Sequence, residues 1–154
     1  MPTILSLLLF ISFSIHAQSL LTPSKETIHL RLAINKEDQT KGLSGMKPQH
    51  FKDHEGMLFV YETPGSRRFW MPDTYFNLDI YFLDSNFKIL AVEKNVPHHP
   101  GIKEPPAIYQ TATYEAHHVL EMKASSPLSK KLKVGDQLLW SDKKKDLNFF
   151  RKKN

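Results

Sequence analysis

The amino-acid sequence predicts a mainly β (α+β) fold: a compact antiparallel sandwich or partly closed barrel with one or two short helices. Three observations indicate this fold: short apolar runs recur along the chain, turn-forming residues separate them at close intervals, and few segments have a helical pattern. The 154 residues are 40% hydrophobic and 11% aromatic, so the chain can bury a core of its own as one domain.

Residues 1–17 are expected to be a secretory signal peptide. An apolar stretch runs from Ile4 to Ile15, the first charged side chain is Lys25, and the small residue Ala17 stands where a signal peptidase would cut. The apolar stretch is shorter than the roughly 20 residues needed to cross a bilayer. Because no Lys or Arg precedes it, an uncleaved anchor is the alternative. Cleavage after Ala17 predicts a periplasmic or secreted protein, and a chain without cysteine is not a lipoprotein.

Three parts are expected after the signal peptide: a linker over residues 18–27, a single β-rich domain over 28–141 and a flexible basic tail over 142–154. The tail contains six Lys or Arg and two Asp residues, so it carries +4 of the formal net charge of +5. Because the rest of the chain is nearly neutral, the basic balance does not indicate a nucleic-acid-binding face. The tail is expected to be solvated, with peripheral contact with an anionic membrane as the alternative.

The domain is expected to begin with a strand and a short helix. From Ile28 to Ile34, apolar residues alternate with polar or small ones, a pattern typical of a half-buried strand. Asn35 is expected to cap a helix from Glu37 to Lys41, because its side-chain oxygen can accept a hydrogen bond from a free N–H group of the first turn. Gly42 is suited to end this helix.

Two β-hairpins are predicted next. A compact apolar run from Gly56 to Val60 and a second strand from Arg67 to Met71 are separated by a Pro-Gly turn, which favours a hairpin. The runs from Leu78 to Leu83 and from Phe87 to Glu93 are joined by an Asp-Ser-Asn cluster, whose side chains hydrogen-bond their own backbone in tight turns.

The last part of the domain is predicted to contain a long loop and two strands. Residues 95–106 hold four of the ten prolines and are expected to form a surface loop, since proline cannot donate to a sheet ladder. A strand from His117 to Met122 follows, and a final strand from Gln137 to Ser141 comes after a turn.

The common signatures of catalytic sites fail on inspection. Gly42-Leu43-Ser44-Gly45 begins like a nucleophile elbow, but Met46 stands where that motif needs a glycine. The six glycines are scattered, so the sequence contains no phosphate-binding glycine loop. A chain without cysteine has neither a cysteine nucleophile nor disulfide bonds.

Histidine spacing gives the best case for a metal site. His98-His99 and His117-His118 are adjacent pairs, and only one member of each could face a common site on a strand. His50 and His54 would share a face if their segment were helical, with zinc or copper as the metal. This spacing is permissive rather than diagnostic, so we predict no metal site and no cofactor.

Two acidic residues interrupt apolar strands. Asp79 lies within the run 78–83, where a buried carboxylate needs hydrogen bonds or a cation such as Arg67 or Arg68. It is therefore either a satisfied structural group or a pocket residue. Glu121 is a second acid of this kind, and the two carboxyl groups could act as general acid and base if they meet within about 5 to 10 Å.

Trp70, Asp73 and Thr74 form an aromatic and polar cluster close to Asp79 in the sequence. Most tryptophans belong to the core, which is one reading of Trp70. The other is a half-exposed indole beside polar groups, an arrangement suited to stacking on a sugar ring or another flat ligand.

Several motifs, taken in order, resemble those of the prokaryotic family called domain of unknown function 192 (DUF192). They are Gly42-Leu43, Gly56-Met57-Leu58-Phe59, Phe69-Trp70-Met71, Asp73-Thr74, Leu78-Asp79-Ile80, Val119-Leu120-Glu121 and Gly135-Asp136. The resemblance spans about Ile28 to Trp140 and implies a compact, β-rich, often exported single domain with no established activity. It marks Trp70, Asp73, Thr74, Asp79 and Glu121 as signature positions without assigned roles. Ser44-Gly45-Met46 departs from the family's usual methionine followed by arginine, and Ala124-Ser125 replaces its usual Ala-Gly.

These observations predict an exported, non-catalytic module that binds a small ligand, a glycan or an envelope partner. The expected ligand-binding residues are Trp70, Asp73, Thr74, Asp79 and Glu121. The first alternative is a hydrolase or lyase that uses Asp79 and Glu121. The second is a structural adaptor that docks on an envelope protein or a membrane through an apolar surface or the basic tail. No nucleic acid is expected as a partner, and the ligand and the oligomeric state stay open.

Overall fold

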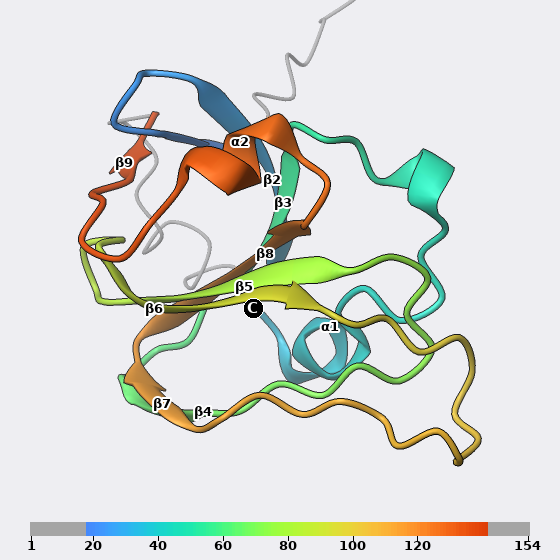
Figure 1. Ribbon diagram of the computed structural model, residues 1–154. Coiled ribbons are helices and arrows are strands. Elements are labelled where there is room, and N and C mark those ends of the chain that lie inside the picture. The colour runs from blue at the N-terminus through green and yellow to red at the C-terminus, as the bar shows by residue number, and fades with distance from the viewer. Residues whose placement is uncertain (1–17, 142–154) are drawn as a thin grey trace, which may run out of the picture.

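The computed structural model describes residues 18–141 (Figure 1). The predicted signal peptide, residues 1–17, and the predicted tail, residues 142–154, lie outside the described residues. The strands are β1 (Ser19–Leu21), β2 (Thr27–Ala33), β3 (Glu55–Phe59), β4 (Gly65–Arg67), β5 (Leu78–Leu83), β6 (Ile89–Val96), β7 (Tyr114–Ala116), β8 (His118–Lys123) and β9 (Leu139–Trp140). The helices are α1 (Lys36–Lys41), the 3₁₀ helix η1 (Pro48–His50) and α2 (Pro127–Lys131).

Seven strands form one curled sheet in the order β6-β5-β8-β3-β2-β1-β9, which makes a half-barrel (Figure 1). The strands β4 and β7 form a separate antiparallel pair. The predicted mainly β fold with two short α-helices and a partly closed barrel is confirmed. Every strand pairing in the main sheet is antiparallel except β2 with β3, where α1 and η1 lie in the long connection that a parallel pair requires.

The main sheet is buried on both faces. One buried cluster contains Leu120 and Met122 of β8 together with Leu132, which follows α2. The cluster on the opposite face contains Val119 of β8 and Met71, from the segment that leads to β5. Because both faces are covered, β5 is buried over its whole length and shows no alternation of apolar and polar residues.

The local predictions for α1 and for the second hairpin are confirmed. The side-chain oxygen of Asn35 accepts a hydrogen bond from the N–H group of Asp38 at 2.8 Å, as expected of an N-cap. Gly42 ends the helix with φ at +49°, a conformation that favours glycine. Strands β5 and β6 pair antiparallel around the turn at 84–86, where Asp84 Oδ1 accepts from the N–H groups of Asn86 and Lys88.

The first predicted hairpin, between the strands at 56–60 and 67–71, is wrong. Strand β3 lies in the main sheet between β2 and β8, whereas β4 pairs with β7. At Gly56 a side chain would place its Cβ only 2.7 Å from Leu120 Cδ1, so β3 fits closely against β8. The chain bends at Glu62 and Thr63 rather than at Pro64-Gly65, since Gly65 already belongs to β4, and the long-range fit of β3 determines its partners.

The segment 18–27, expected to be a linker, contains β1, which pairs with both β2 and β9. Leu20 in β1 is completely buried, so this segment is part of the folded domain. No helix in the described part of the chain is long and apolar enough to cross a membrane.

Candidate functional site

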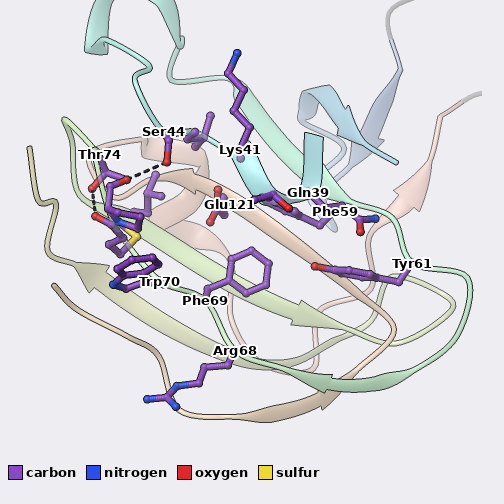
Figure 2. A pocket seen from close by; sticks show the side chains of 16 residues that line it. Gln39, Lys41, Ser44, Phe59, Tyr61, Arg68, Phe69, Trp70, Thr74 and Glu121 are labelled. Carbon is purple, nitrogen blue, oxygen red and sulfur yellow. Dashed lines mark hydrogen bonds between the residues drawn. The ribbon is translucent and has the colours of Figure 1, made fainter. Parts of the chain in front are cut away.

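A cavity of about 170 Å³ lies on the face of the main sheet that carries Glu121 (Figure 2). Its walls come from residues 39–44 at the end of α1, from Phe59 and Tyr61 at the end of β3, and from the segment 68–74 that precedes β5. The fold therefore brings residues that are about 80 positions apart in the chain to one site above β8.

Glu121 is the buried acidic group of this cavity. Its residue is 4% exposed, and its neighbours in β8, Leu120 and Met122, point into the cluster on the opposite face. Among the residues that the structure describes, no side chain or backbone group forms a hydrogen bond or an ion pair with its carboxyl group. Burial raises the pKa of Glu121 to about 8, so the carboxyl is mostly protonated at neutral pH.

Trp70 and Thr74 also line this cavity, as the sequence predicted for a common site. The Trp70 residue is 54% exposed, which places the indole at the rim (Figure 2). Thr74 is buried, and its hydroxyl donates to the carbonyl oxygen of Met71 at 2.9 Å and accepts from the N–H group of His99 at 2.9 Å. These bonds hold the 71–74 turn against the 99–101 loop, so Thr74 shapes the wall of the cavity.

Asp73 lies next to the cavity wall but does not line the cavity. Its φ of +52° is unusual for a residue with a side chain, and the turn holds it there by several hydrogen bonds. The carboxyl oxygen Oδ1 accepts from the Tyr75 hydroxyl at 2.8 Å and from the Gly101 N–H group at 3.3 Å. The backbone carbonyl of Asp73 accepts from the Gly45 N–H group at 2.8 Å. Asp73 therefore joins three loops that surround the site.

Asp79 lies on the opposite face of the sheet and is fully engaged there. Its carboxyl group accepts hydrogen bonds from Ser129 Oγ at 2.6 Å, from the Asn95 N–H group at 2.8 Å and from Lys94 Nζ at 3.1 Å. It borders a wider, open depression of about 680 Å³. Its cation is thus Lys94, and the expected pairing with Arg67 or Arg68 is wrong. These contacts connect β5 to β6 and α2, so Asp79 is the satisfied structural group that the sequence offered as one possibility.

The two acids do not form a catalytic pair. In the register of β5 with β8, Asp79 is opposite Met122 and Ile80 is opposite Glu121. Residues opposite each other in a sheet share a face and successive residues alternate, so the carboxyl groups of Asp79 and Glu121 point to different sides. The hypothesis that they act together as general acid and base is therefore wrong.

Sequence reasoning missed several residues of the cavity, above all Gln39, Ser44, Tyr61 and Phe69. Ser44 was noticed only as part of an incomplete nucleophile motif, and Gln39 carries no local signal because it lies in a short polar helix. The aromatic ring of Phe69 packs edge-to-face on Phe59, with 4.8 Å between ring centroids.

The charged groups that line the cavity besides Glu121 are Lys41 and Arg68, both exposed. Figure 2 shows both side chains extending away from the Glu121 carboxyl. Tyr61 lies under the guanidinium of Arg67, at 3.7 Å from the ring centroid, and burial is the main reason that the pKa of Tyr61 is raised. Within residues 18–141, no three His, Asp or Glu side chains come close enough together to hold a metal ion.

Comparison with known proteins gives a family and two related structures. The family model DUF192, described as "Uncharacterized ACR", matches residues 19–140. A protein from Sinorhizobium meliloti 1021, described as a proposed transcription regulator, is 25% identical with a TM-score of 0.61, over 80% of this chain and 92% of that chain. A protein of unknown function from Novosphingobium aromaticivorans DSM 12444 is 25% identical with a TM-score of 0.62, over 80% of this chain and 84% of that chain. The curated proteins give no match.

Proposed function

This chain belongs to the uncharacterised family DUF192, so its function has to be inferred from the site, and we propose that the protein binds a small organic ligand. The ligand would occupy the cavity above Glu121. The observation that carries this proposal is a carboxyl group that is buried, lines a cavity and has no hydrogen-bond partner in the described residues. Burying such a group costs free energy, and a ligand that bonds to it would recover part of that cost.

The size of the cavity limits the ligand. An apolar cavity of about 150 Å³ holds one benzene molecule. The cavity above Glu121, at about 170 Å³, therefore accommodates a molecule or a chemical group of roughly that size. A larger ligand, such as a glycan, would place one group in the cavity and contact Trp70 at the rim with the rest.

Export is the second part of the proposal and rests on residues 1–17 alone. A cleaved signal peptide would place the binding module in the periplasm or outside the cell, where it meets small solutes and envelope components. The test is the mass of the protein purified from its host. Loss of residues 1–17 would support export, and an intact N-terminus in the cytoplasm would contradict it.

The binding proposal is tested by thermal unfolding of residues 18–154 against a panel of small amines, alcohols, acids and sugars. A ligand that binds the native state raises the unfolding midpoint by mass action. The Glu121→Gln variant should lose the shift or change its selectivity. Glu62→Gln is the matched control, because Glu62 is exposed and does not line the cavity. Equal shifts in both variants and in the parent would place the ligand elsewhere and contradict the proposal.

A further inference from the structure

We propose that the ligand group held in this cavity is a primary ammonium group of a small organic cation, bound by the carboxylate of Glu121. This inference rests on the proposed binding function and adds the chemical class of the ligand. Three features of the cavity lead to it: the hydrogen-bonding roles left to its polar side chains, its aromatic walls and the position of its charges.

Three polar side chains of the walls, Gln39, Ser44 and Thr74, offer acceptors to a ligand because their own N–H or O–H groups are engaged. Gln39 lines the cavity, and its Nε2 donates to the carbonyl oxygens of Val60 at 2.8 Å, Ile34 at 3.0 Å and Ala33 at 3.4 Å. These contacts fix the amide, so that the oxygen is the part of Gln39 left for a ligand. Because an amide oxygen only accepts hydrogen bonds, Gln39 favours a ligand with N–H or O–H groups.

The hydroxyl groups lead to the same conclusion. Ser44 Oγ donates its one proton to the carbonyl oxygen of Pro72 at 3.0 Å, and Thr74 Oγ1 donates to Met71 (Figure 2). A hydroxyl whose proton is engaged can only accept from a further partner. With Glu121, the cavity thus combines a carboxyl group with oxygen acceptors, and a primary ammonium group has three N–H donors to match them.

The aromatic walls add an attraction that is selective for cations. Phe59, Phe69 and Trp70 line the cavity together with Tyr61. The faces of aromatic rings attract cations within about 6 Å of the ring centroid, and this attraction is strongest where water is excluded. A neutral alcohol of the same size would gain the apolar contact but not this electrostatic contribution.

The charges that face the site from the neighbouring elements are compatible with a bound cation. Lys41 on α1 and Arg68 extend away from the carboxyl. The guanidinium of Arg67 on β4 lies over the Tyr61 ring, 3.7 Å from its centroid, and Tyr61 itself is uncharged near neutral pH. On strand β5, the residue opposite Glu121 is Ile80, and isoleucine carries no charge. Among the residues that line the cavity, Glu121 is therefore the carboxyl group that can carry a negative charge beside the ligand.

Binding of an ammonium group has a proton balance that can be measured. In the empty cavity at pH 7, a carboxyl with a pKa of about 8 is protonated in about nine of ten molecules. When the ammonium ion binds, Glu121 ionises and its proton goes to the buffer, so that the complex forms with release of about 0.9 proton at pH 7. An alcohol leaves the carboxyl protonated and releases none.

The experiment is isothermal titration calorimetry of the protein with benzylammonium, cyclohexylammonium and butylammonium and with the matching alcohols. Each titration is run at pH 7 in phosphate and in MOPS, a buffer without a primary ammonium group, because their different ionisation enthalpies report the protons released. We expect each amine that binds to do so at least tenfold more tightly than its alcohol, with nearly one proton released. Glu121→Gln should remove the amine preference and the proton release, whereas Glu62→Gln should leave both unchanged.

The possible results separate the two proposals. Tighter binding of alcohols than amines, or an amine preference that Glu121→Gln keeps, overturns the ammonium inference and leaves the small-ligand proposal standing. No binding by either series overturns the ammonium inference, and the small-ligand proposal falls with it only if the acids and sugars also fail to raise the unfolding midpoint. Because the preference for amines over alcohols is measured in the parent protein, the inference can be refuted even if Glu121→Gln fails to fold.

Discussion

Replacing Glu121 by Gln should change how the stability of the domain depends on pH. The glutamate carboxyl has an ordinary pKa of 4.5, and burial raises it to about 8 in the fold. Between these values the native state keeps a proton that the unfolded chain releases, so raising the pH favours unfolding by about 1.4 kcal/mol per pH step. From pH 5 to pH 8 the parent should therefore lose about 3.5 kcal/mol of stability relative to Glu121→Gln, whose amide does not titrate.

This loss is large beside the roughly 5 to 15 kcal/mol that stabilises a typical domain, so it is measurable. The assay is urea unfolding of the parent, Glu121→Gln and Glu62→Gln at pH 5, 6, 7 and 8. The difference between parent and variant cancels the contribution of the other titrating groups, and Glu62→Gln should follow the parent. Parallel curves for the parent and Glu121→Gln would mean that the carboxyl titrates normally, and the description of Glu121 as a buried protonated acid would then be wrong.

Three further results are expected. Asp79→Asn should lower the free energy of unfolding by about 2 kcal/mol in urea unfolding at pH 7, because it weakens a buried ion pair whose Lys94 side chain is 40% exposed to solvent; an unchanged midpoint would contradict the structural role. Gly56→Ala should cost about 1 to 3 kcal/mol by the same assay, since its Cβ would overlap with Leu120, and equal stability would show that β8 can shift. Trp70→Ala should leave the unfolding midpoint nearly unchanged and weaken ligand binding in calorimetry; a large loss of stability would instead assign the indole to the core.

Local signals in the sequence predict the elements whose structure depends on near neighbours. The cap at Asn35 and the turn around Asp84 depend on hydrogen bonds within four residues, and both form as expected. Strand β3 differs because its partners, β2 and β8, are determined by packing across the chain. A turn signal after β3 therefore gave the wrong hairpin, although the strand itself was recognised.

The sequence predicts only part of the site, because the position of each acid also depends on how the strands pair across the chain. Glu121 stood out as an acid within an apolar strand, and Trp70 and Thr74 do share its cavity. Asp79 gave an equally strong signal, yet it belongs to the other face. The register that places Ile80 opposite Glu121 determines which face Asp79 lies on. No residue pattern within either strand predicts that register.

The base of the cavity, Glu121, and its walls come from different parts of the fold, so the walls can be redesigned separately. Glu121 belongs to β8, which is hydrogen-bonded to β3 and β5 on its two sides, whereas residues 39–44 and 68–74 approach it from outside that ladder. The exposed residues Lys41 and Arg68 of these two segments can be exchanged to narrow or recharge the cavity without altering a pairing of the main sheet. Gln39 and Thr74 hold the walls by hydrogen bonds and have to stay. Gly42 is fixed as well, because its positive φ and a Cβ position 3.2 Å from Phe59 Cζ require glycine. The same scaffold can thus be given new selectivities while its acidic anchor stays in place.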